Sequence, residues 1–420
     1  MSQKTINKLL VANRGEISIR IFRAATELKI RTVAIFTHED RYSLHRYKAD
    51  ESYQIGAEDD PLKPYLNIEE IIALAKRVGA DAIHPGYGFL SENVGFARRC
   101  EQEGIIFVGP KAEVMEQLGD KIAAKKIARK ANVPVIEGAE IQTTDIAKIK
   151  SFAKKIGYPV MLKAAAGGGG RGMRVVREAD TLERNYLEAK GEAGKAFNDD
   201  TIFIEKFIDP PKHIEVQILA DEQGNTVHLY ERDCSVQRRF QKVIEVAPCQ
   251  NISQQTKDKL YSYALAITKS VNYSNAGTVE FLVDKQENIF FIEVNPRIQV
   301  EHTITEEITG IDIVRSQIQI ARGYRLSDPQ IHLKSQEEVP CKGFAIQCRI
   351  TTEDPQNNFT PDYGTIIARR MANGYGIRID AGSIYTGFKV SPFFDSMLIK
   401  VSAKGRTLKG TCRRMVRALS

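Results

Sequence analysis

The chain has 420 residues, 42% hydrophobic and 27% charged, which is typical of a folded enzyme with two or three domains. Its 60 basic and 53 acidic residues give a net charge of +7 that is spread along the chain, so no nucleic-acid-binding role is indicated. The sequence has no apolar signal core, no apolar run of about 18 residues and no metal-type or disulfide-type spacing among its cysteines, so we expect a cytoplasmic protein without membrane contact.

The first third of the chain alternates strands and helices. Buried strands are expected at residues 7–12, 32–36, 82–83 and 105–110, and amphipathic helices at 17–28 and 68–78. This alternation predicts a doubly wound parallel sheet, whose ligands bind at the carboxyl ends of the strands. The loop 84–93 lies at such an end, and its glycines would either admit a ligand to the backbone or simply form a turn.

A run of four consecutive glycines, 167–170, follows a predicted helix at 117–131. Such a run packs no side chains, and its amides suit phosphate oxygens. Because strands are expected on both sides, at 160–163 and 173–176, the run predicts a hairpin flap over a nucleotide. It is neither a P-loop nor a G-x-G-x-x-G turn, and a flexible linker is the alternative.

Two charged segments come next, after a predicted helix at 181–195. The apolar strand 202–208 contains Glu205 and Lys206, which suits an adenine pocket or a surface charge pair. The most basic short run suits phosphate or bicarbonate, or else a solvated face; it contains Arg232, Arg238, Arg239 and Lys242.

Two predicted strands, 278–283 and 289–297, form a hairpin that carries acids. Glu293, Asn295 and Arg297 share one face, because residues two apart on a strand point the same way. Together with Glu280 they offer hard oxygen ligands, which Mg²⁺ prefers, although a hairpin with its acids in water is the alternative. The run 297–302 adds an amide, a carboxylate and an imidazole at the same corner, which predicts a site.

The last quarter has a different pattern. A helix at 305–322 ends before Gly323, and residues 324–340 read as a linker. Strands at 344–350, 364–367, 376–379 and 396–401 predict a mainly β domain. The helix 406–419 stops at Ser420, which indicates a chain cut inside its last domain.

Several long motifs make the chain resemble the biotin carboxylase family, most closely the biotin carboxylase domain of pyruvate carboxylases. The motifs are residues 12–17, 84–93, 167–173, 231–239 and 293–302, and residues 347–355 favour pyruvate carboxylases over acyl-CoA carboxylases. The resemblance implies an α/β fold with a doubly wound N-terminal domain (1–115), a central ATP-grasp domain (116–325, with a mobile lid at about 136–205) and an incomplete, mainly β C-terminal domain (340–420).

The resemblance also implies a reaction, in which ATP and Mg²⁺ or Mn²⁺ activate bicarbonate as carboxyphosphate and the carboxyl group passes to biotin. In pyruvate carboxylases this step serves gluconeogenesis. The expected ATP contacts are Lys121, Lys163, Gly169, Gly170, Glu205, Lys206, Ile208, His213, Gln237, Glu280 and Glu293. The expected metal ligands are Glu280, Glu293 and Asn295, and the expected bicarbonate contacts are Lys242, Arg297, Gln299 and Val300.

Glu301 matches the general base of the family, and Tyr87 and Arg349 match the biotin contacts. The expected catalytic set is therefore Arg297, Glu301, Lys242 and Arg349. Arg23 and Glu27 match a dimer contact, so a homodimer through the N-terminal region is expected, with a larger oligomer for a full-length protein.

Two departures from the family pattern are visible. Phe240 stands where the family usually has His, and the biotin attachment motif Met-Lys-Met is absent. Biotin is therefore expected from a carrier domain or a separate carrier protein. The alternatives are an acyl-CoA carboxylase component, an ATP-grasp ligase acting on another carboxylate, and a nucleotide-binding module without catalysis.

Overall fold

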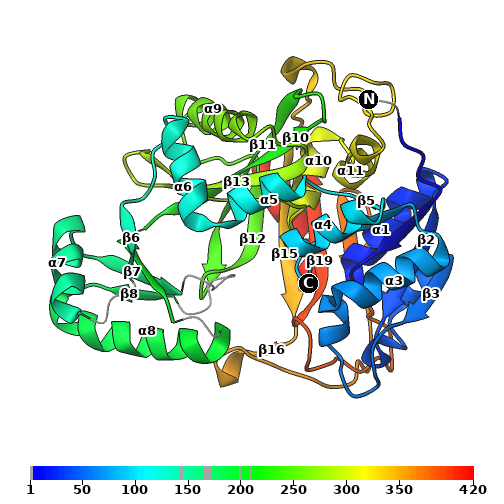
Figure 1. Cartoon of the computed structure of the whole chain (residues 1–420), viewed down its shortest axis with the longest axis horizontal. Coiled ribbons are helices and arrows are strands. Elements are labelled where there is room, and N and C mark those ends of the chain that lie inside the picture. The colour runs from blue at the N-terminus through cyan, green and yellow to red at the C-terminus, as the bar shows by residue number, and fades with distance from the viewer. Residues whose placement is uncertain (1–2, 142–144, 165–172, 198–199, 209) are drawn as a thin grey trace.

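The N-terminal unit is a parallel sheet covered by helices (Figure 1). The computed structural model describes residues 3–141, 145–164, 173–197, 200–208 and 210–420. The sheet has the order β3-β2-β1-β4-β5, formed by Lys8–Val11 (β1), Arg31–Phe36 (β2), Glu51–Gln54 (β3), Ala82–His84 (β4) and Ile106–Phe107 (β5). The helices are Gly15–Glu27 (α1), Leu44–Lys48 (α2), Ile68–Val78 (α3) and Val94–Gln102 (α4). The predicted doubly wound sheet is confirmed, although β5 is shorter than the expected strand 105–110.

The strand order reverses between β1 and β4, so the loops that follow these two strands meet at a switch point. The side-chain amide of Asn13 joins them, donating to Pro85 O at 2.7 Å and to Tyr87 O at 2.9 Å. Gly86 has φ +66° and lies against Asn13, where a Cβ would come within 2.8 Å of the Asn13 amide nitrogen. The glycine therefore lets the two loops approach each other.

A second, four-stranded sheet forms a small unit with two helices, seen at the left of Figure 1. Its order is β6-β9-β7-β8, from Gly138–Ile141 (β6), Val160–Ala164 (β7), Arg174–Val176 (β8) and Ile202–Lys206 (β9), with Ile146–Ile156 (α7) and Leu182–Phe197 (α8). β7 and β8 pair antiparallel, so the predicted hairpin is confirmed. Its tip, with the expected ATP contacts Gly169 and Gly170, lies outside the described residues.

The largest sheet runs through the middle of the molecule in the order β14-β13-β10-β11-β12-β15-β19-β18. Its strands are Lys212–Ala220 (β10), Thr226–Arg238 (β11), Gln241–Ala247 (β12), Asn275–Val283 (β13), Ile289–Asn295 (β14), Phe344–Thr351 (β15), Ile377–Ala381 (β18) and Met397–Gly405 (β19). Glu353–Asp354 (β16) and Thr360–Pro361 (β17) form a separate ribbon. The expected C-terminal strands 344–350, 376–379 and 396–401 thus continue the central sheet, because β12 pairs with β15. The expected strand 364–367 is wrong: only an isolated bridge from Thr365 to Lys389 is described there.

Two helices that were expected to be continuous are broken. Residues 117–131 divide into Ala112–Gly119 (α5) and Lys121–Lys130 (α6), because the Asp120 carboxylate caps α6 and accepts from the amides of Ile122 and Ala123. Residues 305–322 divide into His302–Thr309 (α10) and Ile313–Ala321 (α11), because Gly310 takes a left-handed conformation at φ +72°.

The remaining helices are Gln254–Ser270 (α9) and Leu408–Leu419 (α12), the latter close to its predicted position. Over the described part of the chain, no helix has the length and apolar character that crossing a membrane requires. All six cysteines carry free thiols.

Candidate active site

One large cavity lies between the small four-stranded sheet, the central sheet and the loops that follow β1 and β4. Its volume is about 1400 Å³. The described site residues expected from the sequence all line it: Tyr87, Lys121, Lys163, Glu205, Lys206, Ile208, His213, Gln237, Lys242, Glu280, Glu293, Asn295, Arg297, Gln299, Val300, Glu301 and Arg349. Residues far apart in the sequence are therefore gathered in one place.

The ammonium of Lys242 is the electrostatic centre of this cavity. Its Nζ lies 2.6 Å from Glu215 Oε2, 3.0 Å from Glu280 Oε1 and 2.8 Å from Glu301 Oε1. Each of its three N–H groups can therefore meet one carboxylate. Burial opposes the charge, but these carboxylates hold the pKa of Lys242 well above its usual range. Lys242 is therefore a fixed cation.

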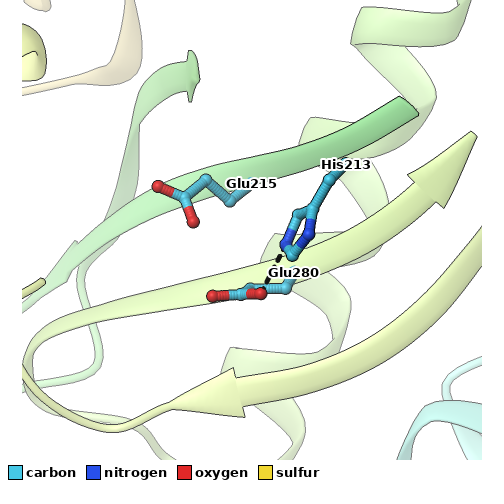
Figure 2. A group of neighbouring side chains, drawn as sticks. All are labelled: His213, Glu215 and Glu280. Carbon is cyan, nitrogen blue, oxygen red and sulfur yellow. Dashed lines mark hydrogen bonds and ion pairs between the residues drawn. The ribbon is translucent and has the colours of Figure 1, made fainter. Parts of the chain in front are cut away.

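Among the residues that the structure describes, two groups of side chains have the separation of metal ligands, with ligand atoms within 4.8 Å of one another in each. They are His213, Glu215 and Glu280, shown in Figure 2, and Glu215, Cys234 and Glu301. β10 places His213 and Glu215 two residues apart on one face, and Glu215 pairs across the strands with Glu280. Because Lys242 bonds to all three carboxylates, its ammonium already supplies the positive charge that a metal would bring. Glu215, Glu280 and Glu301 thus form a three-carboxylate cage around the ammonium of Lys242.

The expected metal ligands Glu280 and Glu293 face each other across the β13–β14 hairpin. Glu280 is heavily engaged: His213 lies 2.5 Å from Oε2, and the amides of Asn295 and Gln299 donate to Oε1 at 2.9 and 2.7 Å. Burial, and then the charge of Glu280, raise the pKa of Glu293. A divalent cation held by both carboxylates would relieve this repulsion, so these two residues fit a metal.

Asn295 fits the metal less directly. Its amide oxygen accepts a hydrogen bond from Arg297 at 2.9 Å, and its amide nitrogen points to Glu280. Arg297 also forms an ion pair with Glu92 at 3.2 Å. The predicted strand 289–297 ends at Asn295, so Arg297 lies beyond it and the predicted shared strand face does not extend to Arg297; the two side chains instead bind each other. Asn295 could ligate a metal only after Arg297 released its oxygen.

The expected base Glu301 lies between two cations. Its Oε1 accepts from Lys242, and its Oε2 lies 3.1 Å from Arg349. Burial favours protonation of Glu301, but Lys242 and Arg349 outweigh it and hold its pKa well below the usual range. Arg349 in turn donates to the fully buried Glu245 through Nε at 2.7 Å. Glu301 is thus a carboxylate at neutral pH.

A buried arginine braces the side of the cavity that contains Lys242 and Gln299. Arg232 has no exposed surface and forms an ion pair with Glu215 at 2.5 Å. It also donates to Gln299 at 2.8 Å, which orients the amide that Gln299 turns toward Glu280. The interpretation of the basic run 232–242 as a solvated face is therefore wrong for Arg232, while Arg238 bonds to Glu353 at the hairpin end.

Two lysines share the buried carboxylate of Glu205 at the end of β9. Lys163 bonds to Oε2 at 2.7 Å, and Lys125, which the sequence analysis missed, bonds to Oε1. Burial would raise the pKa of Glu205, but the two ammonium groups lower it to about 2. Lys121 lies nearby, and burial lowers its pKa. This corner of the cavity therefore has a net positive charge, suited to phosphates.

Other predicted contacts have additional roles in the structure. Lys206 lines the cavity, but its ammonium donates to the carbonyls of Gly157 and Tyr158 at 2.8 and 3.0 Å and so also holds the small sheet together. The amide of Gln237 bonds to His213 Nδ1 at 2.9 Å and so orients the imidazole toward Glu280. The Tyr87 hydroxyl donates to Glu16.

Several residues of the site were not found from the sequence: Glu16, Lys125, Glu215, Glu245 and Lys400. A signal existed for Glu215, because its position two residues after His213 on a predicted strand puts both on one face. For the others the contacts join strands and helices that are far apart in the chain.

Three family models match the chain. They are described as "Biotin carboxylase, N-terminal domain" (residues 5–115), "Carbamoyl-phosphate synthase L chain, ATP binding domain" (120–329) and "Biotin carboxylase C-terminal domain" (347–420). Among curated proteins, the pyruvate carboxylase of Bacillus subtilis is 54% identical over 419 residues, which cover 100% of this chain and 36% of that protein. The chain thus spans about a third of the length of the curated relatives it matches.

Solved structures match over nearly the whole chain. The biotin carboxylase domain dimer of Hydrogenobacter thermophilus 2-oxoglutarate carboxylase, in complex with MgADP, ADP and bicarbonate, is 46% identical with a TM-score of 0.94 and covers 99% of this chain and 90% of that one. The Campylobacter jejuni biotin carboxylase–β-γ-ATP complex is 42% identical, with a TM-score of 0.92 and coverage of 99% and 91%. The expected α/β fold with a central ATP-grasp unit is confirmed by these likenesses.

Proposed function

The chain belongs to the biotin carboxylase family, and we propose that it activates bicarbonate with ATP and Mg²⁺ or Mn²⁺ to carboxyphosphate, then carboxylates the ureido nitrogen of biotin. The observation that carries this proposal is the chain of contacts from the acid hairpin through Lys242 to Glu301 and Arg349. It joins Glu280, a proposed metal ligand, to the proposed base and a second cation within one cavity. The relative from Hydrogenobacter thermophilus was solved with MgADP and bicarbonate, which supports the same ligands here.

We assign the nucleotide to the corner formed by Lys121, Lys163 and Glu205. The lysines would balance the phosphate charge, and the apolar end of β9 near Ile208 would enclose the base. Glu280 and Glu293 would hold the metal, which neutralises charge on the phosphates when bound. Lys163 and Lys121 then keep the phosphates oriented toward Lys242.

Bicarbonate is assigned to Lys242, Arg297, Gln299 and the backbone at Val300. Glu301, next to Lys242, would accept the bicarbonate proton as the anion attacks the phosphate. In the structure the cations around Glu301 make it a weak base. An arriving anion would share Lys242 and Arg297, and this sharing would raise the pKa of Glu301 toward a useful value.

Arg349 is assigned to the ureido oxygen of biotin, with Tyr87 beside it. The negative charge on that oxygen grows only as the ureido nitrogen attacks the carboxyl carbon, while the C–O bond to phosphate breaks and the departing phosphate takes the proton from the nitrogen. A guanidinium held by Glu245 is positioned in advance for that charge, and this favours the transition state.

The proposed domain boundaries are 1–115, 116–325 and 340–420. We propose that biotin reaches the site on a carrier, that the chain forms a homodimer through its N-terminal region, and that it acts in the cytoplasm. We propose that the chain is part of a larger protein and that pyruvate finally accepts the carboxyl group, because the matching curated relatives are pyruvate carboxylases. The likeness to a 2-oxoglutarate carboxylase makes 2-oxoglutarate the second candidate.

The proposal is tested by measuring ADP release from the 420-residue chain while ATP, Mg²⁺, bicarbonate and biotin are omitted one at a time. We expect fast release only with all four present. Fast release that is independent of bicarbonate would place the chain among nucleotide hydrolases, and release driven by a different carboxylate would favour another ATP-grasp ligase.

Replacing Phe240 with His should lower the KM for ATP. Phe240 lies in the turn between β11 and β12, lines the cavity and is 39% exposed. A His could donate a hydrogen bond to the nucleotide, which is worth roughly 1.5–3 kcal/mol to a charged group and corresponds to about tenfold or more in affinity. Because Arg238, Arg239 and Lys242 are close in the chain, we expect about tenfold and no change in bicarbonate dependence. An unchanged or higher KM for ATP would contradict this.

Replacing Glu293 with Gln should remove most turnover at limiting Mg²⁺. The amide lacks the charge that would hold the metal with Glu280, so the Mg²⁺ concentration for half-maximal ATP cleavage should rise about tenfold or more. A titration of Mg²⁺ at constant ATP measures this, and the control is Glu287→Gln, in the turn of the same hairpin, whose carboxylate accepts from Ser253 and Thr256. Near-normal cleavage at every Mg²⁺ concentration would show that the hairpin is not the metal site.

A further inference from the structure

Lys400 is a buried lysine that touches both sides of the proposed reaction site. It lies on β19 and has no exposed surface. Its ammonium lies 3.0 Å from Glu16 Oε1 and donates at 3.0 Å to the backbone carbonyl of Val300. Three separate parts of the chain therefore meet at one ammonium: the first turn of α1, the loop before α10 and the C-terminal strand.

The sheet register places Lys400 beside the proposed biotin contact. Lys400 pairs directly with Arg349 across β15 and β19, and directly opposed residues of an antiparallel pair point to the same face. On its other side it pairs with Asp380 of β18. Two cations thus stand next to each other: the partly exposed Arg349, paired with Glu245 and Glu301, and the buried Lys400, which faces Glu16 and Asp380.

Glu16 carries the influence of Lys400 to Tyr87. Its Oε1 forms an ion pair with Lys400 and accepts a hydrogen bond from the Tyr87 hydroxyl, while its buried Oε2 has no hydrogen-bond partner in the described structure. Glu16 and Tyr87 both line the cavity. Because Oε2 has no partner, the contacts of Oε1 with Lys400 and Tyr87 are what hold this carboxylate in place. Removing the lysine would therefore let Glu16 and Tyr87 move together.

Val300 links Lys400 to the bicarbonate side. Its carbonyl is followed in the chain by Glu301, the proposed base, and preceded by Gln299. By donating to this carbonyl, the ammonium fixes the peptide between Val300 and Glu301. It thereby also fixes the position of the Glu301 Cα, from which the side chain extends. Displacements of about 1 Å in such groups are enough to lower reaction rates by about a hundredfold.

We propose that Lys400 is a positioning residue that sets the bicarbonate loop, through Val300, and the biotin contact Tyr87, through Glu16, in register with each other. This inference rests on the proposed function, since bicarbonate is the proposed ligand beside Val300 and biotin the proposed ligand beside Tyr87. Lys400 itself touches neither ligand in this assignment. It aligns the loop that carries Glu301, where carboxyphosphate would form, with Tyr87, beside the biotin that would receive the carboxyl group.

The test uses Lys400→Met, which keeps length and apolar volume but removes the ammonium. We expect the KM for bicarbonate in ATP cleavage to rise about tenfold, and the yield of carboxybiotin per ADP to fall about tenfold, with the KM for ATP unchanged. Glu16→Gln should lower only the yield of carboxybiotin per ADP, because Lys400 still holds Val300. Free biotin and ¹⁴C-bicarbonate are the probes.

A double variant separates positioning from stability. Lys400→Met alone leaves Glu16 buried without its cation and should lower Tm, whereas Lys400→Met with Glu16→Gln removes both charges and should recover Tm. The carboxybiotin yield should stay low in the double variant. Lys404→Met, four residues along the same strand, is the control expected to match the wild type.

The inference is overturned if Lys400→Met keeps the wild-type KM for bicarbonate and the wild-type yield of carboxybiotin per ADP. It is also overturned if that yield recovers together with Tm in the double variant. These outcomes are distinct from failure of the proposed function. In that case the wild-type chain itself would make no carboxybiotin.

Discussion

Replacing Glu301 with Gln is expected to abolish bicarbonate-dependent ATP cleavage and biotin carboxylation together, each by roughly 10²–10⁴-fold. Gln is nearly isosteric, and its one amide oxygen can meet either Lys242 or Arg349, which bind different oxygens of Glu301. The amide, however, cannot take a proton from bicarbonate as it attacks the phosphate. Both activities depend on that first step, and both are measured in the same reaction as ADP and ¹⁴C-carboxybiotin.

Arg349→Ala should separate the two activities. Its guanidinium is assigned to the ureido oxygen, so slow bicarbonate-dependent ATP cleavage should persist while carboxybiotin falls below detection. The fold should survive the change, because burial already raises the pKa of Glu245 and the carboxyl can become neutral once Arg349 is absent. Arg99→Ala, in a surface ion-pair group with Glu69 and Glu103, is the control. Equal loss of both activities in Arg349→Ala would contradict this division of roles.

The second large effect is expected for Lys242→Met, on stability as well as on activity. The change leaves Glu215, Glu280 and Glu301 buried close together without their shared cation. Breaking a buried ion pair from one side destabilises by about 3–5 kcal/mol, and here three carboxylates lose a partner. ATP cleavage should be lost as well, because Lys242 is assigned to the bicarbonate.

The deficit of Lys242→Met should depend on pH in a defined direction. In the wild type, Glu280 and Glu301 have lowered pKa values, so their contribution to stability is present above the unfolded pKa of about 4.3 and is lost as the pH falls. In the variant, burial and mutual repulsion raise these pKa values, so the folded state gains protons and stability at low pH. The difference in unfolding midpoint should therefore be smaller at pH 5.5 than at pH 8.

A matched lysine tests whether the cage is responsible. Lys257 is as little exposed as Lys242, 14% against 13%, but it pairs with the single carboxylate of Glu231 at 3.0 Å. Lys257→Met should lower the unfolding midpoint less and should keep the bicarbonate dependence of ATP cleavage. A difference between variant and wild type that is the same at both pH values, or equal losses in Lys242→Met and Lys257→Met, would argue against the three-carboxylate cage.

The sequence was informative where a local pattern carries the geometry. The period of two in the hairpin predicted that Glu293 and Asn295 share a face, and β14 confirms the strand. The signals for the two broken helices were also local, an Asp at the N-cap of α6 and a glycine after α10, but the longer apolar periodicity concealed them. A capping residue can end a helix inside a continuous apolar pattern, and Asp120 and Gly310 do so here.

Other features depend on pairings that no local pattern encodes. The joining of β12 to β15 makes one sheet of two expected domains and places Glu245 beside Gln347 and Arg349. The charge of Lys242 was visible in the sequence, but its position between three acids from different strands and a loop was not. The same holds for Lys400, which reads as an ordinary strand lysine until β19 is placed against β15.

The most direct test of the central claim follows the atoms of bicarbonate in the reaction of the wild-type chain. With ¹⁴C- and ¹⁸O-labelled bicarbonate, MgATP and biotin, the account predicts one ¹⁴C-carboxybiotin for each ADP, and one ¹⁸O transferred to each phosphate through carboxyphosphate. ADP formed without ¹⁸O in the phosphate, or without labelled carboxybiotin, would contradict it.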